Sequence, residues 1–181
     1  MKVVGIVGSP RTGSNSEILV RRVLEGASSK GAEVELFKIN ELKINWCQGC
    51  FNCQETGKCK QTDDMGKIYS ALETADAVVI GSPIYMGHVT AQTKTFLDRL
   101  FALVKISAGE SKLKGKKLIL VYSQGAGNDG EMIMKEIGKR LSNFGMQLLG
   151  IIGGNMLNQP EAVKERKELL ESAFKLGSQI S

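Results

Sequence analysis

Residues 5–16 read Gly-Ile-Val-Gly-Ser-Pro-Arg-Thr-Gly-Ser-Asn-Ser. They overlap the apolar run Val3–Val7 and lead into an amphipathic segment that begins at Asn15. A buried strand that turns into a helix through small and hydroxyl residues points several backbone N–H groups and the positive end of the helix dipole at one place. The stretch therefore predicts a phosphate-binding loop between the first strand and the first helix.

The kind of phosphate follows from the composition of this loop. It has neither the Gly-x4-Gly-Lys-Ser/Thr spacing of an ATP-binding loop nor the Gly-x-Gly-x2-Gly fingerprint of dinucleotide sites. It offers polar side chains instead: Ser9, Arg11, Thr12, Ser14, Asn15 and Ser16. Such a loop suits a phosphate monoester, as in FMN, better than a pyrophosphate. The alternative is an ordinary strand-to-helix connection in which Ser14 or Ser16 caps the helix.

Length and composition predict a single domain over residues 1–181. The hydrophobic content of 42% is enough to fill a sizeable core. No apolar run approaches the roughly 18–20 residues that span a bilayer, and the N-terminus lacks the layout of a signal peptide. We therefore expect a cytoplasmic protein without a membrane partner. The net charge of +5 is spread along predicted helices and interleaved with Glu, so we expect no nucleic-acid partner.

Strand and helix patterns alternate five times along the chain. The predicted strands cover residues 2–8, 33–39, 77–81, 117–122 and 146–152. The predicted helices cover residues 15–30, a segment after Asp63-Asp64, a segment around residues 97–104, and residues 131–144 and 160–177. The first strand is nearly all apolar and belongs in the middle of a sheet, whereas the second alternates and lies nearer an edge. The pattern predicts an α/β fold with a doubly wound parallel sheet.

In such sheets, ligands bind beyond the carboxyl ends of the strands, where the loops after the first, third and fourth strands lie. The third strand is followed by Pro83, Ile84, Tyr85, Met86 and Gly87, which present an aromatic face and exposed amides to a flat ring. The alternative is that Tyr85 and Met86 fold back onto the core. The fourth strand is followed by Ser123, Gln124 and Gly125, where glycine lets the backbone approach a ligand closely. No side chain is assigned as a catalytic acid, base or nucleophile.

All four cysteines lie in one segment, residues 40–62, which lacks helix or strand periodicity. They are spaced Cys47-x2-Cys50-x2-Cys53-x5-Cys59. Four thiolates at this spacing can converge on one soft metal centre, such as a cubane iron-sulfur cluster. A four-thiolate zinc site and free thiols remain alternatives. Disulfides are the poorer explanation in a cytoplasmic chain.

These motifs together resemble the flavodoxin-like NAD(P)H-dependent FMN reductases and, within them, the iron-sulfur flavoproteins. The resemblance covers essentially the whole chain and implies a five-stranded sheet of strand order 2-1-3-4-5. It implies that Ser9, Arg11, Ser14, Asn15 and Ser16 hold the phosphate of FMN. It also implies that residues 83–87 pack on the isoalloxazine ring, that residues 123–127 close its other side, and that the four cysteines bind a [4Fe-4S] cluster.

The resulting hypothesis is an electron-transfer flavoprotein that passes electrons between a [4Fe-4S] cluster and FMN, with a redox partner such as ferredoxin or NAD(P)H. One alternative is an NAD(P)H-dependent reductase of FMN or quinones with structural or zinc-binding cysteines. Another is a non-enzymatic flavodoxin-like scaffold. Trp46 and Phe51 are more hydrophobic than an exposed loop normally carries, so we expect a homodimer or homotetramer with the cysteine segment in its interface.

Overall fold

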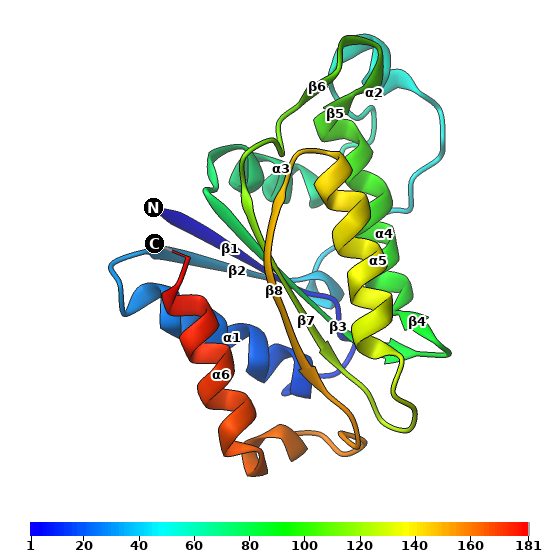
Figure 1. Ribbon diagram of the computed structural model, residues 1–181. Coiled ribbons are helices and arrows are strands. Elements are labelled where there is room, and N and C mark those ends of the chain that lie inside the picture. Colours follow the sequence, from blue (N-terminus) through cyan, green and yellow to red (C-terminus); the bar gives the residue numbers. More distant parts are fainter. Residues whose placement is uncertain (181) are drawn as a thin grey trace.

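A computed structural model describes residues 1–180, and its centre is a parallel sheet. The five parallel strands are β1 (Lys2–Val7), β2 (Glu33–Lys38), β3 (Ala77–Tyr85), β7 (Lys117–Ser123) and β8 (Gln147–Gly154). They lie in the order β2-β1-β3-β7-β8 (Figure 1). The predicted strand order 2-1-3-4-5 is therefore confirmed, with β7 and β8 as its fourth and fifth members.

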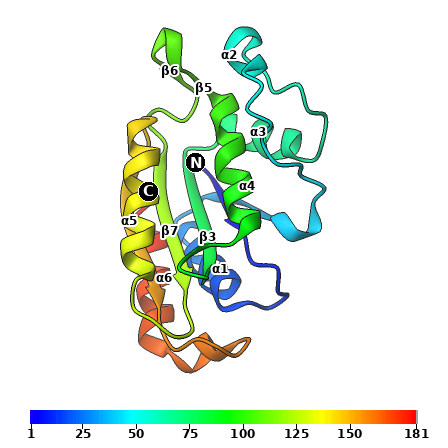
Figure 2. The same cartoon turned by 90° about the vertical axis from the view of Figure 1, so that its right-hand side faces the viewer.

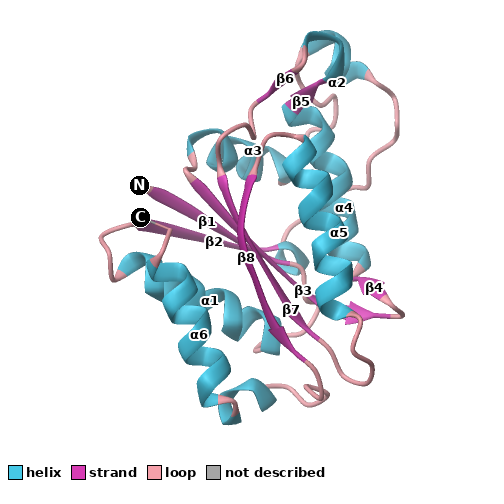
Figure 3. Cartoon of the chain, viewed as in Figure 1, coloured by secondary structure: helices cyan, strands magenta, loops and turns pink. Residues whose placement is uncertain are grey.

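Helices cover both faces of the sheet (Figures 1 and 3). One face carries α1 (Asn15–Ser28) and α6 (Lys167–Ser178), which lie side by side. The other face carries α3 (Met65–Thr74), α4 (Ala91–Arg99) and α5 (Gly130–Asn143). Among the residues described, no helix combines the length and the apolar character needed to cross a membrane.

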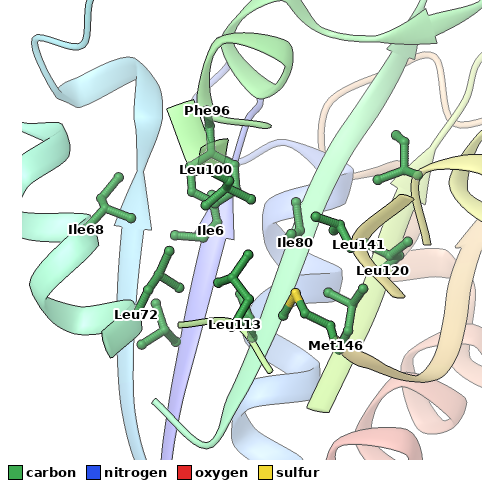
Figure 4. Close-up of a cluster of buried hydrophobic side chains, with 14 of the residues drawn as sticks. Ile6, Ile68, Leu72, Ile80, Phe96, Leu100, Leu113, Leu120, Leu141 and Met146 are labelled. Carbon is green, nitrogen blue, oxygen red and sulfur yellow. The ribbon is translucent and has the colours of Figure 1, made fainter. Parts of the chain in front are cut away.

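Two hydrophobic cores result from this layering, one on each face of the sheet. In β1, Val4 and Ile6 belong to the core under α3, α4 and α5, whereas Val3 and Val7 belong to the core under α1 and α6. Successive side chains of a strand point to opposite faces, so a strand covered on both sides is apolar at every position. Figure 4 shows the larger core, with residues of the strands facing residues of the helices: Ile6, Ile80 and Leu120 facing Phe96, Leu100 and Leu141.

The predicted end of the third strand was wrong. Residues 82–85 continue β3 and pair with β7 as far as Pro83, and Tyr85 then pairs with His88 of the short antiparallel strand β4 (His88–Val89). The connecting residues Met86 and Gly87 have φ angles of 49° and 72°. Two consecutive positive φ angles define the tight hairpin turn that matches the twist of its strands. The predicted loop after the third strand is thus a hairpin.

The predicted start of the last helix at residue 160 was also wrong. Residues 162–165 form the 3-10 helix η4 (Ala162–Glu165), and α6 begins only at Lys167. Asn15 at the start of α1 explains the difference, because its side chain bonds the backbone of this segment. Its Nδ2 donates to the carbonyls of Leu157 and Gln159 at 3.1 and 2.8 Å, and its Oδ1 accepts from Val163 N at 2.9 Å.

The cysteine segment follows β2 at the edge of the sheet and contains short elements that the sequence did not predict. It begins with η1 (Ile39–Glu41) and includes α2 (Asn52–Thr56). After α4 come η2 (Leu100–Leu103), the hairpin of β5 (Val104–Lys105) and β6 (Glu110–Ser111), and η3 (Ile106–Ala108) between them. Figures 1 and 2 show α2 beside β5 and β6, at the end of the molecule opposite the β3–β4 hairpin.

Candidate functional site

A cleft of about 470 Å³ lies at the carboxyl ends of the parallel strands. This volume falls in the range of small-molecule sites. Four loops line the cleft, with these residues: Ser9, Arg11, Ser14, Asn15, Pro83, Ile84, Tyr85, Met86, Ser123, Gly125, Ala126, Leu157, Asn158 and Pro160. The fold therefore brings together most of the residues that the sequence singled out for a flavin.

The loop after β1 presents hydroxyls and amides at the N-terminus of α1. Ser14 is the N-cap of α1, and its Oγ accepts from Glu17 N at 3.2 Å. The capping role and the phosphate role do not exclude each other, because Ser14 also lines the cleft. Ser16 is fully buried, with its Oγ 3.4 Å from Ser14 Oγ, and Thr12 is exposed. Neither Ser16 nor Thr12 lines the cleft.

The β3–β4 hairpin forms one wall of the cleft. Pro83 and Ile84, at the base of the hairpin, are buried, whereas Tyr85 and Met86, at its tip, have exposed fractions of 39% and 102%. The alternative in which Tyr85 and Met86 fold back into the core is therefore wrong. The guanidinium carbon of Arg11 lies 6.0 Å from the centre of the Tyr85 ring, across the mouth of the cleft. Gly87 serves the hairpin turn and does not line the cleft.

The loop after β7 contributes Ser123 and Gly125 but not the side chain of Gln124. The Gln124 amide turns toward α5, where its Nε2 donates to Asp129 Oδ1 and its Oε1 accepts from Gly130 N at 2.9 Å. A Cβ on Gly125 would lie 2.1 Å from Asn158 Oδ1, so any other residue at this position would displace the Asn158 side chain. Gln124 therefore fixes the loop rather than lining the cleft.

A fourth loop, after β8, was missed by sequence reasoning. It contributes Leu157, Asn158 and Pro160. Its backbone is tied to the neighbouring loop by Leu157 N, which donates to the Gln124 carbonyl at 2.9 Å. Its position could have predicted its place in the cleft, because every loop that follows a parallel strand lies at the same end of the sheet.

The four cysteines line a second, smaller cavity of about 40 Å³. All four are free thiols; Cys47 and Cys50 are exposed, and Cys53 and Cys59 are half-buried. Within residues 1–180, no three His, Cys, Asp or Glu side chains are gathered closely enough to hold a single metal ion. Four thiols are the ligands that a [4Fe-4S] cluster needs. Those of this chain surround one cavity, where each would bind a different iron.

A buried ion pair lies beside this cavity. Arg99 donates from Nη1 to Asp63 Oδ2 at 2.7 Å and from Nη2 to Asp63 Oδ1 at 3.0 Å, and both side chains are at most 5% exposed. Burial opposes the charge of Asp63, but hydrogen bonds from Arg99 and two backbone amides hold its pKa below the ordinary value of 3.8. Burial likewise opposes the charge of Arg99, yet its bonds to Asp63 and Tyr69 raise its pKa. Burial raises the pKa of Tyr69 to about 12, so its hydroxyl keeps its proton.

Helix α4 connects the two cavities. At its start, Thr90 Oγ1 donates to the carbonyl of Gly8, at the end of β1 beside the cleft. At its end, Asp98 and Arg99 line the cavity of the cysteines. With 9 residues, α4 is about 13 Å long. The cleft and the cavity of the cysteines therefore lie near opposite ends of α4.

Comparison with known proteins identifies a family and relatives of this chain. Residues 1–152 match the family described as NADPH-dependent FMN reductase. An iron-sulfur flavoprotein of Archaeoglobus fulgidus is 36% identical over 100% of this chain and 79% of its own length. Another, of Methanocaldococcus jannaschii, is 42% identical over 55% of this chain and 51% of its own length, so the match spans about half of that relative.

Among solved structures, the NAD(P)H:quinone oxidoreductase from Methanothermobacter marburgensis has the same fold. It superposes with a TM-score of 0.78 over 100% of this chain and 99% of its own, at 17% identity. At this identity the likeness concerns the fold alone.

Proposed function

Because the chain belongs to the NADPH-dependent FMN reductase family and, within it, to the iron-sulfur flavoproteins, we propose that it is an electron-transfer flavoprotein with two redox centres. FMN binds in the cleft at the carboxyl ends of the strands, and a [4Fe-4S] cluster binds to the four cysteines. The observation that carries this proposal is that each set of residues lines one cavity.

The residues of the cleft suit the parts of FMN. Ser9, Ser14 and the N-terminus of α1 bind the phosphate, and the positive end of the helix dipole favours its charge. Arg11 adds a cation at the rim. The β3–β4 hairpin supports one side of the isoalloxazine ring, and the glycine at position 125 lets the backbone approach the other. Bound FMN supplies the exchange between one-electron and two-electron transfer, while the protein orients it and limits water.

The cysteines suit a cluster better than a single zinc ion. A tetrahedral four-thiolate zinc has Zn–S bonds of about 2.3 Å, which place its sulfurs roughly 4 Å apart. The thiols of this chain form no such single-ion site within the described residues, and the two-residue gaps between Cys47, Cys50 and Cys53 resemble those that wrap a cubane cluster. A cubane cluster needs four thiolates around a wider centre, because each binds a separate iron. The free thiols around one cavity support this assignment.

The proposal includes assembly and a redox partner. Trp46 and Phe51, on the cysteine segment, have exposed fractions of 74% and 61%. Large apolar side chains at such exposure favour contact with another subunit. We infer a homodimer or homotetramer in which the cysteine segment of one subunit faces the flavin cleft of another, since α4 separates the two sites within one chain. Electrons enter or leave through a partner such as NAD(P)H or ferredoxin, in the cytoplasm.

A second candidate is an NAD(P)H-dependent reductase of FMN or quinones with structural or zinc-binding cysteines. The match to the NADPH-dependent FMN reductases over residues 1–152 favours it, because that match includes three of the four loops that line the cleft. It differs from the first candidate only in what the cysteines hold.

An ultraviolet-visible spectrum of anaerobically purified protein, with assays for FMN, iron, acid-labile sulfide and zinc, tests the proposal. We expect flavin bands, a broad iron-sulfur shoulder, and about four irons and four sulfides per chain. Flavin bands with zinc or without metal favour the reductase. A protein that binds neither flavin nor metal contradicts both candidates and leaves a scaffold.

A further inference from the structure

Arg99, in the last turn of α4, is among the largest fully buried side chains of the protein. Arginine is almost never fully buried unless its charge is paired. Its side chain is 1% exposed, and it lines the same cavity as the four cysteines. The question is why a cation is kept at this place.

The contacts of Arg99 join both ends of the cysteine segment. Besides Asp63, its Nη1 donates to the carbonyl of Asn45 at 2.7 Å. Asn45 lies two residues before Cys47, and Asp63 lies four residues after Cys59. Asp63 Oδ2 also accepts from Asn45 N at 3.0 Å. One guanidinium therefore closes the loop that carries all four thiols.

Tyr69 completes the group on the side of α3. Its hydroxyl accepts from Arg99 Nε at 3.3 Å and donates to the carbonyl of Arg99 at 2.8 Å. Every nitrogen of the Arg99 guanidinium therefore donates a hydrogen bond, and the acceptors lie in three segments: before Cys47, after Cys59 and in α3. Cys59 lines the same cavity as Arg99 and Tyr69.

Stability alone does not explain this arrangement. Replacing a buried ion pair by apolar residues of similar volume is often neutral or stabilising, because desolvation of the two charges offsets their attraction. A fixed cation beside four thiolates has a different effect. The reduction potential of an iron-sulfur cluster depends on the nearby charge, the hydrogen bonds to its sulfurs and its exposure to solvent.

We propose that Arg99 is a positioning residue for the cysteine centre and that its charge, tempered by Asp63, sets the reduction potential of that centre. This inference rests on the cluster of the proposed function. Reduction adds an electron to a centre that already carries thiolate charge, and the buried guanidinium stabilises the added electron. Asp63 holds the guanidinium in place and cancels part of its field.

Three variants separate charge from structure. Asp63→Asn keeps the shape of the side chain and leaves Arg99 uncompensated, so we expect a higher potential than in the wild type. Adding Arg99→Met to this variant removes the cation. We expect the reduction potential of the double variant to be at least 59 mV lower than that of Asp63→Asn, which for one electron is a tenfold change in the equilibrium constant of reduction. Adding Arg99→Lys instead keeps a cation and keeps the potential high.

The potentials are measured by redox titration of the anaerobically reconstituted full chain, followed by its iron-sulfur absorbance, with iron and sulfide assayed in each variant. Arg22→Met is the matched control, since Arg22 is a half-buried arginine of α1 outside the cavity of the cysteines and pairs with Glu25 at 2.6 Å. We expect this variant to keep the wild-type potential.

The outcomes distinguish this inference from the proposed function. A wild-type protein without labile sulfide overturns both. A wild-type protein that holds a cluster, but whose potential is unchanged by Asp63→Asn, overturns only the role of the Arg99 charge. Should the Arg99 variants fail to hold iron, the comparison of Asp63→Asn with the wild type still decides, because it leaves Arg99 in place.

Discussion

Removal of the Arg11 side chain tests the flavin cleft most directly. Arg11 is exposed at the rim, and its Nη1 donates to the carbonyl of Asn158 at 3.3 Å. Its backbone N donates to Ser9 Oγ at 3.2 Å, a contact that alanine retains. Arg11→Ala therefore removes a cation from the cleft while leaving the loop in place.

The size of the effect follows from the charge and exposure of Arg11. A hydrogen bond to a charged group contributes about 1.5–3 kcal/mol. Because Arg11 is exposed, the lower end applies, and a loss of about 1.5 kcal/mol weakens the binding of FMN about tenfold. Riboflavin has no phosphate, so its affinity should change far less. Arg11→Lys keeps the charge but not the planar fork, and should fall between the wild type and Arg11→Ala.

The assay is fluorescence titration of the flavin-free protein with FMN and with riboflavin, at low and high salt. The preference for FMN should shrink as salt screens the exposed charge. Arg22→Ala, on α1 but outside the cleft, is the control and should leave both affinities unchanged. Equal losses of FMN and riboflavin in Arg11→Ala would refute the assignment of the phosphate to this loop.

Three further predictions concern the rest of the protein. Replacing Cys53 by Ala should remove most of the iron and labile sulfide, because a three-thiolate site leaves one iron with an exchangeable ligand; undiminished sulfide in this variant argues against a four-cysteine cluster. The pKa of Asp63 is held below 3.8, so its stabilising carboxylate is present above about pH 4 and lost as the pH falls further. The free energy of unfolding, from urea titrations between about pH 6 and pH 3, should therefore fall more steeply in the wild type than in Asp63→Asn, and parallel curves would contradict this. Finally, Trp46→Ser with Phe51→Ser should produce monomers that bind FMN but lose electron transfer between the centres; a wild type that sediments as a fully active monomer rules this out.

The sheet could be predicted from the sequence because a strand that is buried on both faces has apolar residues at successive positions. Every position of β1 from Val3 to Val7 is buried, so the strand reads as an unbroken apolar run. In β2 no residue is fully buried, and its alternating charges correctly indicated an edge strand. Both patterns lie within the strand itself, and they were sufficient to predict that β1 lies inside the sheet and β2 at its edge.

What the sequence did not predict depends on contacts between distant residues. The late start of α6 depends on Asn15, which bonds residues more than 140 positions away. The burial of Arg99 is a similar case, because an arginine in an amphipathic helix normally marks the exposed face. Its partner Asp63 lies 36 positions earlier in the chain. Local periodicity carries no information about such pairs.

The position of α4 limits how the two proposed centres can communicate. Its start is fixed to β1, where Thr90 bonds the Gly8 carbonyl and a Cβ on Gly8 would lie 1.8 Å from Thr93 Oγ1. Its end is fixed to the cysteine segment through Arg99 and Asp63. Bringing the cysteines to the cleft within one chain would require breaking one of these buried contacts, and separating a buried ion pair costs about 3–5 kcal/mol. In the proposed assembly, contact between two subunits would bring the exposed Trp46 and Phe51 against another cleft without that cost, which is why we expect the transfer of electrons to depend on assembly.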